Sequence, residues 1–181
     1  LMVLGNFNMA NAPELNRKLV ERGQHPVFGT DTQTVLEEIG FFLDQAHQNI
    51  YRRSKVNKVP GTEIPGLISE RLHMPRLLRK ASKIWDGGYA IAGAVGNGDA
   101  FVMRDPNGIR PAFYFDNEDF VGFASERVHL MTVFELEKDE FSEGPPGHVV
   151  SIKNSGELTV ERFSDEKPKT RSEMSIQRGH K

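Results

Sequence analysis

The apolar residues of this chain change their spacing once, at the segment Trp85-Asp86-Gly87-Gly88. Before it, apolar residues recur at the three- and four-residue spacing of helices, and after it short apolar runs alternate with turn residues. Helices followed by a series of hairpins predict an α+β fold with mainly antiparallel strands. The run over residues 89–96 is continuously apolar, which is typical of a strand covered on both faces. The sequence therefore predicts two packed sheets with helices on the outside.

Two helices are predicted in the first fifty residues. The first begins at Pro13-Glu14, with Asn11 as its N-cap and Gly23 as its stop. The second begins after Thr30, because Thr30 and Gln33 match a capping box, and its helical spacing continues to about residue 51.

A loop and a helical pair are expected next. Residues 52–64 are basic and contain Pro60-Gly61, so they are expected to form a mobile surface loop. Two helices are predicted over residues 66–73 and 75–85, with Pro75 breaking the pattern between them.

The rest of the chain is predicted as strands and turns. A short strand over residues 1–4 is followed by a turn-rich stretch over residues 6–11. Asn97-Gly98 is a strong signal for a two-residue hairpin turn, and Ser125 is expected to cap a short helix. Further strands are expected at residues 99–103, 112–115, 120–124, 149–153 and 158–163, and a polar linker or tail at residues 164–181.

The composition excludes several classes of function. The formal net charge is −2, so no nucleic-acid or anionic-membrane surface is predicted. The chain has no cysteine, which excludes disulfides, thiolate metal sites and a cysteine nucleophile within its 181 residues. The histidines have no partner at metal-ligand spacing, so no metal site is predicted. No apolar run approaches the ~20 residues of a membrane span, and the cytoplasm is the expected compartment.

The segment Arg104–Pro111 is the most specific stretch of the sequence. Asp105-Pro106-Asn107-Gly108 is typical of a turn. Arg104 and Arg110 can pair with Asp105 or donate to backbone carbonyls, so a structural role for Arg104, Asp105, Gly108 and Arg110 is favoured. A role at a domain interface or in a substrate loop is the alternative.

Five further segments strengthen the sequence signal given by Arg104–Pro111. They are Asn8–Leu15, Thr30-Asp31, Asp86–Ile91, Ala124-Ser125-Glu126 and Pro146-Gly147-His148. In this order and spacing, the blocks resemble the glutaminase domain of the amidophosphoribosyltransferase family. The members of this family are class II glutamine amidotransferases, whose glutaminase domains are of the N-terminal-nucleophile hydrolase type. The similarity covers about residues 3–160. The unbroken segment 107–111 favours this family over the glutaminase domains of asparagine, glucosamine-6-phosphate and glutamate synthases.

The resemblance implies a four-layer αββα sandwich and a glutamine-dependent activity. In this family an N-terminal cysteine releases ammonia from glutamine. The ammonia passes to a phosphoribosyltransferase domain of the same protein, which uses Mg and converts PRPP into 5-phosphoribosylamine for purine biosynthesis. No cofactor is expected in this chain itself, and a homo-oligomer is compatible with the resemblance.

The resemblance also implies three residues of a glutamine site. Asn6 aligns with the asparagine whose side chain forms the oxyanion hole, and Phe7 replaces the neighbouring glycine, leaving a backbone N–H as a possible donor. A bulky residue is strained at position 7 if that position requires a positive φ. Asp31 aligns with the carboxylate that binds the α-ammonium of glutamine. The simpler alternatives are that Asn6 caps a turn and that Asp31 is a first-turn acid favoured by the helix dipole.

The missing thiol leads to an expectation about the whole chain. Residues 1–163 are expected to be a partial glutamine amidotransferase domain, incomplete at the N-terminus and inactive alone, and residues 164–181 a linker or tail. The alternative is a catalytically dead domain of the same fold, kept for binding or regulation, which Phe7 and the missing cysteine support.

Overall fold

Two antiparallel sheets form the centre of the computed structural model, which describes residues 1–165. The larger sheet has the strand order β1-β2-β3-β7-β8 and the smaller sheet β5-β4-β6. Every pairing between these strands is antiparallel, as predicted. The strands are β1 Met2–Met9, β2 Gly87–Ala94, β3 Ala100–Arg104, β4 Phe113–Asp116, β5 Val121–Ala124, β6 Ser142–Glu143, β7 His148–Ile152 and β8 Leu158–Arg162.

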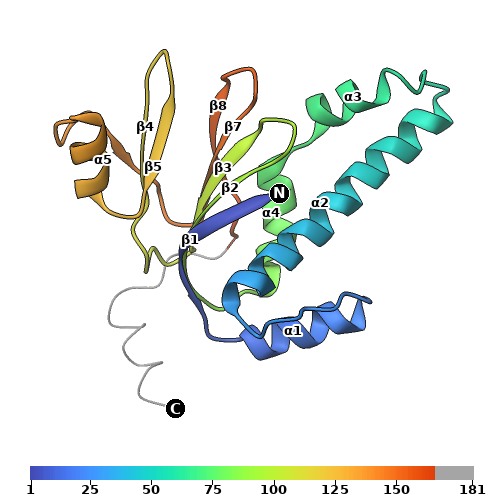
Figure 1. The fold of residues 1–181 in the computed structure, drawn as a ribbon, viewed down its shortest axis with the longest axis horizontal. Coiled ribbons are helices and arrows are strands. Elements are labelled where there is room, and N and C mark those ends of the chain that lie inside the picture. The colour runs from blue at the N-terminus through green and yellow to red at the C-terminus, as the bar shows by residue number, and fades with distance from the viewer. Residues whose placement is uncertain (166–181) are drawn as a thin grey trace.

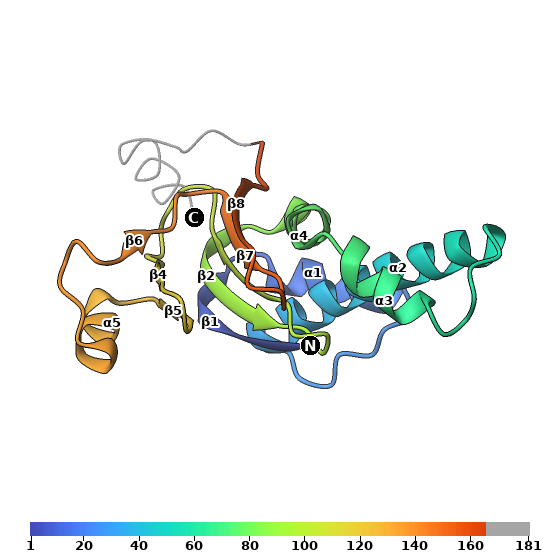
Figure 2. The same ribbon diagram turned by 90° about the horizontal axis from the view of Figure 1, so that it is seen from above.

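Helices cover the two sheets on opposite sides, as Figures 1 and 2 show. Helices α1, α2 and α4 pack on the larger sheet, α3 packs against α2, and α5 lies against the smaller sheet. The predicted αββα arrangement is therefore confirmed, with α5 alone forming the outer layer beside the smaller sheet. The helices are α1 Ala12–Glu21, α2 Asp31–Val56, α3 Ile64–Arg71, α4 Met74–Ala81, η1 Ser82–Ile84 and α5 Arg127–Phe134.

Three groups of buried side chains hold the layers together. The largest lies between the helices and the larger sheet and includes Ile39 of α2, Leu78 of α4 and Ile91 of β2. A small group of Ala90, Val102 and Ala112, with Phe123 packed against it, joins the two sheets. The third group packs Phe113 and Phe115 of β4 against Leu130 of α5. The contact between the sheets is thus much thinner than the contact between sheet and helices.

The first strand is longer than the sequence predicted. A strand over residues 1–4 and turns over residues 6–11 were expected, but β1 continues to Met9. It does so because β2 pairs with it throughout, from Met2 opposite Ala94 to Met9 opposite Gly87. Asn11 precedes α1 as predicted, but its side chain makes no cap. Instead its amide donates to the carbonyl of Ile84 at 2.8 Å and accepts from the backbone N–H of Asp86 at 3.1 Å.

The loop predicted over residues 52–64 is wrong at both ends. Helix α2 continues to Val56 and α3 begins at Ile64. The buried side chains of Ser54 and Ile64 explain this, because tertiary packing holds both segments against the rest of the chain. The break between α3 and α4 falls at Leu72 and His73, and Pro75 lies in the first turn of α4, where its missing N–H costs no helical bond.

The predicted caps of α2 and α5 differ from the structure in part. Thr30 caps α2 by accepting from the backbone N–H of Gln33, but the Gln33 side chain accepts from Phe28 rather than from Thr30. The residue before α5 is Glu126, so the cap predicted at Ser125 is wrong. The two-residue strand β6 was not predicted. The predicted tail lies outside the described residues from position 166 onward.

A buried ion pair ties the two hairpins of the larger sheet to α3. Asp99, in the β2–β3 turn, is 2% exposed and accepts from the Lys153 ammonium at 2.9 Å and from the backbone N–H of Asn154 at 3.0 Å. The same ammonium donates to the carbonyls of Leu72 and Ser69. Burial raises the pKa of Asp99, but the hydrogen bonds from Lys153 and Asn154 outweigh it, so the pKa lies below its ordinary value.

We expect Asp99→Asn to lower the free energy of unfolding by about 1–3 kcal/mol at neutral pH, because it leaves the Lys153 ammonium without its counter-ion. The folded-state pKa of Asp99 is depressed, so its contribution is present above the unfolded pKa of about 3.9 and is lost as pH falls through the folded value. Urea unfolding at neutral pH and below pH ~4 measures this. The exposed Glu157→Gln is the control, and an Asp99→Asn effect that persists unchanged in acid would contradict the account.

Candidate active site

Asn6 lies in a cavity between the two sheets. The cavity has a volume of about 350 Å³ and is lined from one side by Leu4 to Asn6 of β1 and by residues 90–92 of β2, and from the other by Phe123 to Ser125. Asn6 and Ser125 supply the only polar side chains in this lining, and the Asn6 amide forms no hydrogen bond with any residue in the range 1–165. A half-buried amide without a partner, in an apolar cavity, is available to a ligand.

Gly5, beside Asn6, is required by the closeness of β2. A Cβ atom at position 5 would lie 2.4 Å from the carbonyl oxygen of Ala90, so a larger residue would push β1 away from its partner. Phe7, on the other side of Asn6, lies opposite Tyr89 in the ladder, and its side chain packs against the core under the helices. Phe7 does not have a positive φ, so the backbone at this position is unstrained.

Asp31 lies where α2 begins, at the far end of β1 from the N-terminus. Its Oδ2 atom accepts from the backbone N–H of Met9 at 2.8 Å, and it is half-buried. Within residues 1–165, this is the one hydrogen bond of its carboxylate, so Oδ1 has no partner there. Asp31 does not line the cavity that contains Asn6, and Met9 follows Asn6 by three residue steps, about 10 Å along an extended strand. Strand β1 therefore positions both predicted residues. The Asn6 side chain lies on the face of the strand that lines the cavity, and the N–H of Met9, at the end of the strand, binds the Asp31 carboxylate.

The carboxylate of Asp105 organises the turn after β3. Asp105 is fully buried and accepts four backbone hydrogen bonds. Its Oδ1 atom accepts from Asn107 at 3.0 Å and Ile109 at 2.9 Å, and its Oδ2 atom from Arg110 at 3.0 Å and Tyr89 at 3.3 Å. Charge-assisted bonds of this kind are about twice as strong as neutral ones. The turn and the first residues of β2 are thus held by one side chain.

The guanidinium of Arg104 closes the same turn from the other side. It donates to the carbonyls of Arg110 at 2.7 Å, Gly108 at 3.1 Å and Gly144 at 2.8 Å, and to the Glu143 carboxylate at 2.8 Å. Arg110 itself is half-buried, and its Nε atom has no hydrogen-bond partner among residues 1–165. Neither arginine pairs with Asp105, although the sequence left that open.

Sequence blocks that lie far apart meet at this turn. Gly88 has no room for a side chain, because a Cβ atom would lie 2.6 Å from a methyl group of Ile109. Gly108 has φ +63°, and a Cβ atom there would lie 2.8 Å from Pro146. The backbone N–H of Gly147 donates to the carbonyl of Asp105 at 3.1 Å. Glu143 was missed by sequence reasoning, since its role depends on β6 lying beside β4, and no local pattern marks so short a strand.

The described residues contain no group of three His, Asp or Glu side chains that could hold a metal ion. No helix among them is both long enough and apolar enough for a bilayer crossing.

Two solved structures are similar to this chain over 91% of its length. One is glutamine phosphoribosylpyrophosphate (PRPP) amidotransferase from B. subtilis complexed with ADP and GMP, with a TM-score of 0.61 and 22% sequence identity. The other is described as the allosteric regulatory enzyme of purine biosynthesis, with a TM-score of 0.64 and 22% identity. Each match covers 29% of the other chain, so this chain spans less than a third of the length of those proteins. Scans of the sequence against protein-family models and against curated proteins find no match.

These likenesses agree with the resemblance in the sequence and confirm the predicted fold. The chain has an α+β, four-layer architecture similar to that of the matching part of a PRPP amidotransferase.

The Asp105 carboxylate gives a direct test of how the turn is held. We expect Asp105→Ala to lower the free energy of unfolding by at least about 3 kcal/mol, because four backbone donors lose their acceptor. Asp105→Asn keeps one acceptor oxygen and should lose less. Urea unfolding measures both, with the exposed Asp139→Ala as the matched control. Equal unfolding midpoints for Asp105→Ala and Asp139→Ala would show that the turn does not depend on this carboxylate.

Proposed function

We propose that this chain is part of the glutamine amidotransferase domain of a PRPP amidotransferase. In the complete protein the domain supplies ammonia from glutamine to a phosphoribosyltransferase domain, which makes 5-phosphoribosylamine from PRPP. The fold shared with a PRPP amidotransferase and the order of the sequence blocks support this proposal. The observation that carries it is the unpartnered Asn6 amide in a cavity between the sheets. The resemblance in the sequence aligns this residue with the oxyanion asparagine.

In this proposal, Asn6 stabilises the tetrahedral intermediate of glutamine hydrolysis. Its side-chain N–H donates to the oxygen that gains charge when a nucleophile attacks the glutamine carboxamide. The cavity around it is lined almost entirely by apolar side chains, so a hydrogen bond to a developing anion is strong there. The backbone N–H of Phe7 is the proposed second donor, and its unstrained strand conformation is compatible with that role.

Asp31 is proposed to hold the α-ammonium of glutamine. The hydrogen bond from Met9 fixes the Oδ2 atom and leaves the Oδ1 atom for a ligand. A carboxylate anchored in this way can orient a cation without moving on binding.

The nucleophile of the reaction lies outside these residues. With no cysteine among its 181 residues, this chain cannot supply the thiol, and it is expected to be inactive alone. The turn around Asp105 is proposed to be structural, since the bonds of Asp105 and Arg104 all go to the protein itself.

A catalytically dead domain kept for binding is the second candidate. Phe7 in place of glycine and the missing thiol favour it. The residues upstream of Leu1 discriminate the two: a Cys-Gly-Ile start there supports the enzyme, and any other start supports the binding domain.

We expect Asn6→Ala, made in the complete protein, to lower kcat for glutamine-dependent synthesis by about 10²–10³-fold, as loss of one oxyanion donor does elsewhere. Synthesis from added ammonia should stay at the wild-type rate, because it bypasses the glutamine site. Steady-state assays with each nitrogen donor measure the two rates, and the exposed Asn57→Ala is the control. Unchanged glutamine-dependent synthesis would exclude the oxyanion role of Asn6.

Asp31→Asn in the complete protein should raise KM for glutamine and leave ammonia-dependent synthesis intact. The neutral amide cannot pair with the α-ammonium, but it retains an oxygen that can accept from Met9. An equal loss of both activities would instead mean that Asp31 supports the fold.

A further inference from the structure

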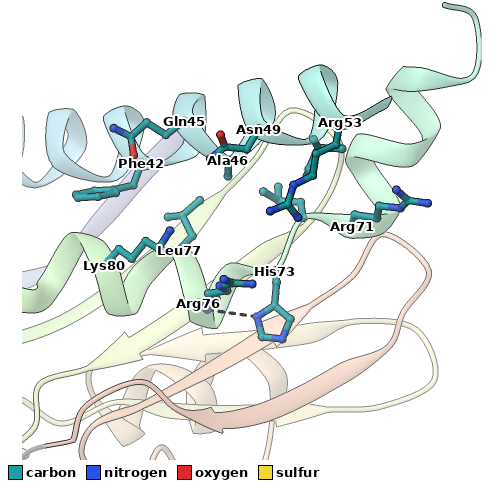
Figure 3. A pocket seen from close by; sticks show the side chains of 12 residues that line it. Phe42, Gln45, Ala46, Asn49, Arg53, Arg71, His73, Arg76, Leu77 and Lys80 are labelled. Carbon is teal, nitrogen blue, oxygen red and sulfur yellow. Dashed lines mark hydrogen bonds between the residues drawn. The ribbon is translucent and has the colours of Figure 1, made fainter. Parts of the chain in front are cut away.

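A groove with basic side chains on its rim lies on the helix layer (Figure 3). Helix α2 forms one side of the groove, and the end of α3 and the start of α4 form the other. The groove has a volume of about 210 Å³. Its floor is apolar and includes Phe42, Ala46 and Leu77. Its rim carries the basic side chains Arg53, Arg71, His73, Arg76 and Lys80, and its lining contains no Asp or Glu. We call this feature the basic groove.

Four cations of the basic groove have no partner among residues 1–165. The side chains of Arg53, Arg71, Arg76 and Lys80 are exposed and form no hydrogen bond or ion pair with any of residues 1–165. One acidic group, Glu161, pairs with this rim, its carboxylate lying 3.6 Å from Nε2 of His73. Asp44 is on α2 but, by the helical period, on the side opposite Phe42 and Arg53.

Such a concentration of one charge differs from an ordinary solvated helix surface, where both signs are interspersed. Figure 3 shows Arg53 descending from α2 toward the α3–α4 connection, where Arg71 and His73 lie. Like charges that face one another across a groove repel, and a bound anionic group relieves that repulsion.

The dimensions of the basic groove favour a chain segment over a small ligand. Along α2 it extends from Phe42 to Arg53, about 16 Å at 1.5 Å per residue. An extended peptide of about five residues spans the same length. A single phosphate would therefore meet only a fraction of the rim.

We propose that the basic groove binds an acidic segment of a protein partner. The apolar side chains of this acidic segment contact Phe42 and Leu77 on the floor of the groove. The carboxylates of the segment pair with Arg53 and Arg76 on the two sides. A nucleic acid is disfavoured because the formal net charge of the chain is −2. The larger sheet separates this groove from the cavity of Asn6, so the inference does not depend on the proposed function.

The test uses the full 181-residue chain and a fluorescein-labelled peptide of about ten residues in which Glu and Leu alternate, long enough to span the groove. Fluorescence anisotropy should show binding that weakens as salt rises. Arg53→Gln/Arg76→Gln should raise Kd by about tenfold or more. The control Lys55→Gln/Lys138→Gln removes the same charge outside the groove lining and should leave Kd unchanged.

Two further measurements complete the design. A peptide with Gln in place of Glu should not bind the wild-type chain. Arg53→Glu/Arg76→Glu should bind a peptide in which Lys replaces Glu, which shows that the doubly substituted groove still folds.

Three results would overturn the proposal. The first is no binding of the Glu peptide at about 1 mM. The second is equal weakening by both pairs of substitutions, which would mean that net charge alone attracts the peptide. The third is tighter binding of a single-stranded oligonucleotide through Arg53 and Arg76, which would identify the surface as a nucleic-acid site.

Discussion

One buried carboxylate, that of Asp105, holds the junction on which the two-sheet arrangement depends. It accepts from four backbone donors and thereby fixes where β2 begins and how the chain leaves β3 for the smaller sheet. Arg104 closes the same junction through the carbonyl of Gly144 and the carboxylate of Glu143, which belong to the return of the chain from the smaller sheet. Few buried side chains join the two sheets directly, so the hydrogen bonds of this junction are a main link between them. The cavity that contains Asn6 lies between the same two sheets.

Much of the fold was predictable because its signals are local. Thr30 with Gln33, Asn97-Gly98 and the change of spacing at Gly87-Gly88 each act within a few residues, and the structure has the predicted helix start, hairpin and strand at these places. The two-residue form predicted for the hairpin turn is wrong, because Val95 pairs with Asp99 across a three-residue loop in which Gly98 alone has a positive φ. Errors arose where a distant partner decides the outcome. β1 extends past its expected end because β2 lies beside it, and α2 extends because Ser54 is buried.

The candidate site was predictable only in part, for a similar reason. The resemblance supplied Asn6 and Asp31, but no spacing in the sequence shows that one faces a cavity and the other binds the end of the same strand. The partners of Arg104 could not be predicted either, since Glu143 and Gly144 follow it by about 40 residues. The structure thus gives the turn over residues 104–111 a concrete physical task, which is to join the sheets. The basic groove has no counterpart in the motifs, because its side chains come from separate helices.

A crystal structure of the complete protein with glutamine bound tests the central claim most directly. The account predicts the glutamine carboxamide oxygen within hydrogen-bond distance, about 3 Å, of the Asn6 amide nitrogen, and the α-ammonium at a similar distance from the free oxygen of Asp31. A glutamine bound elsewhere, with the Asn6 cavity empty, would contradict it and leave only a shared fold.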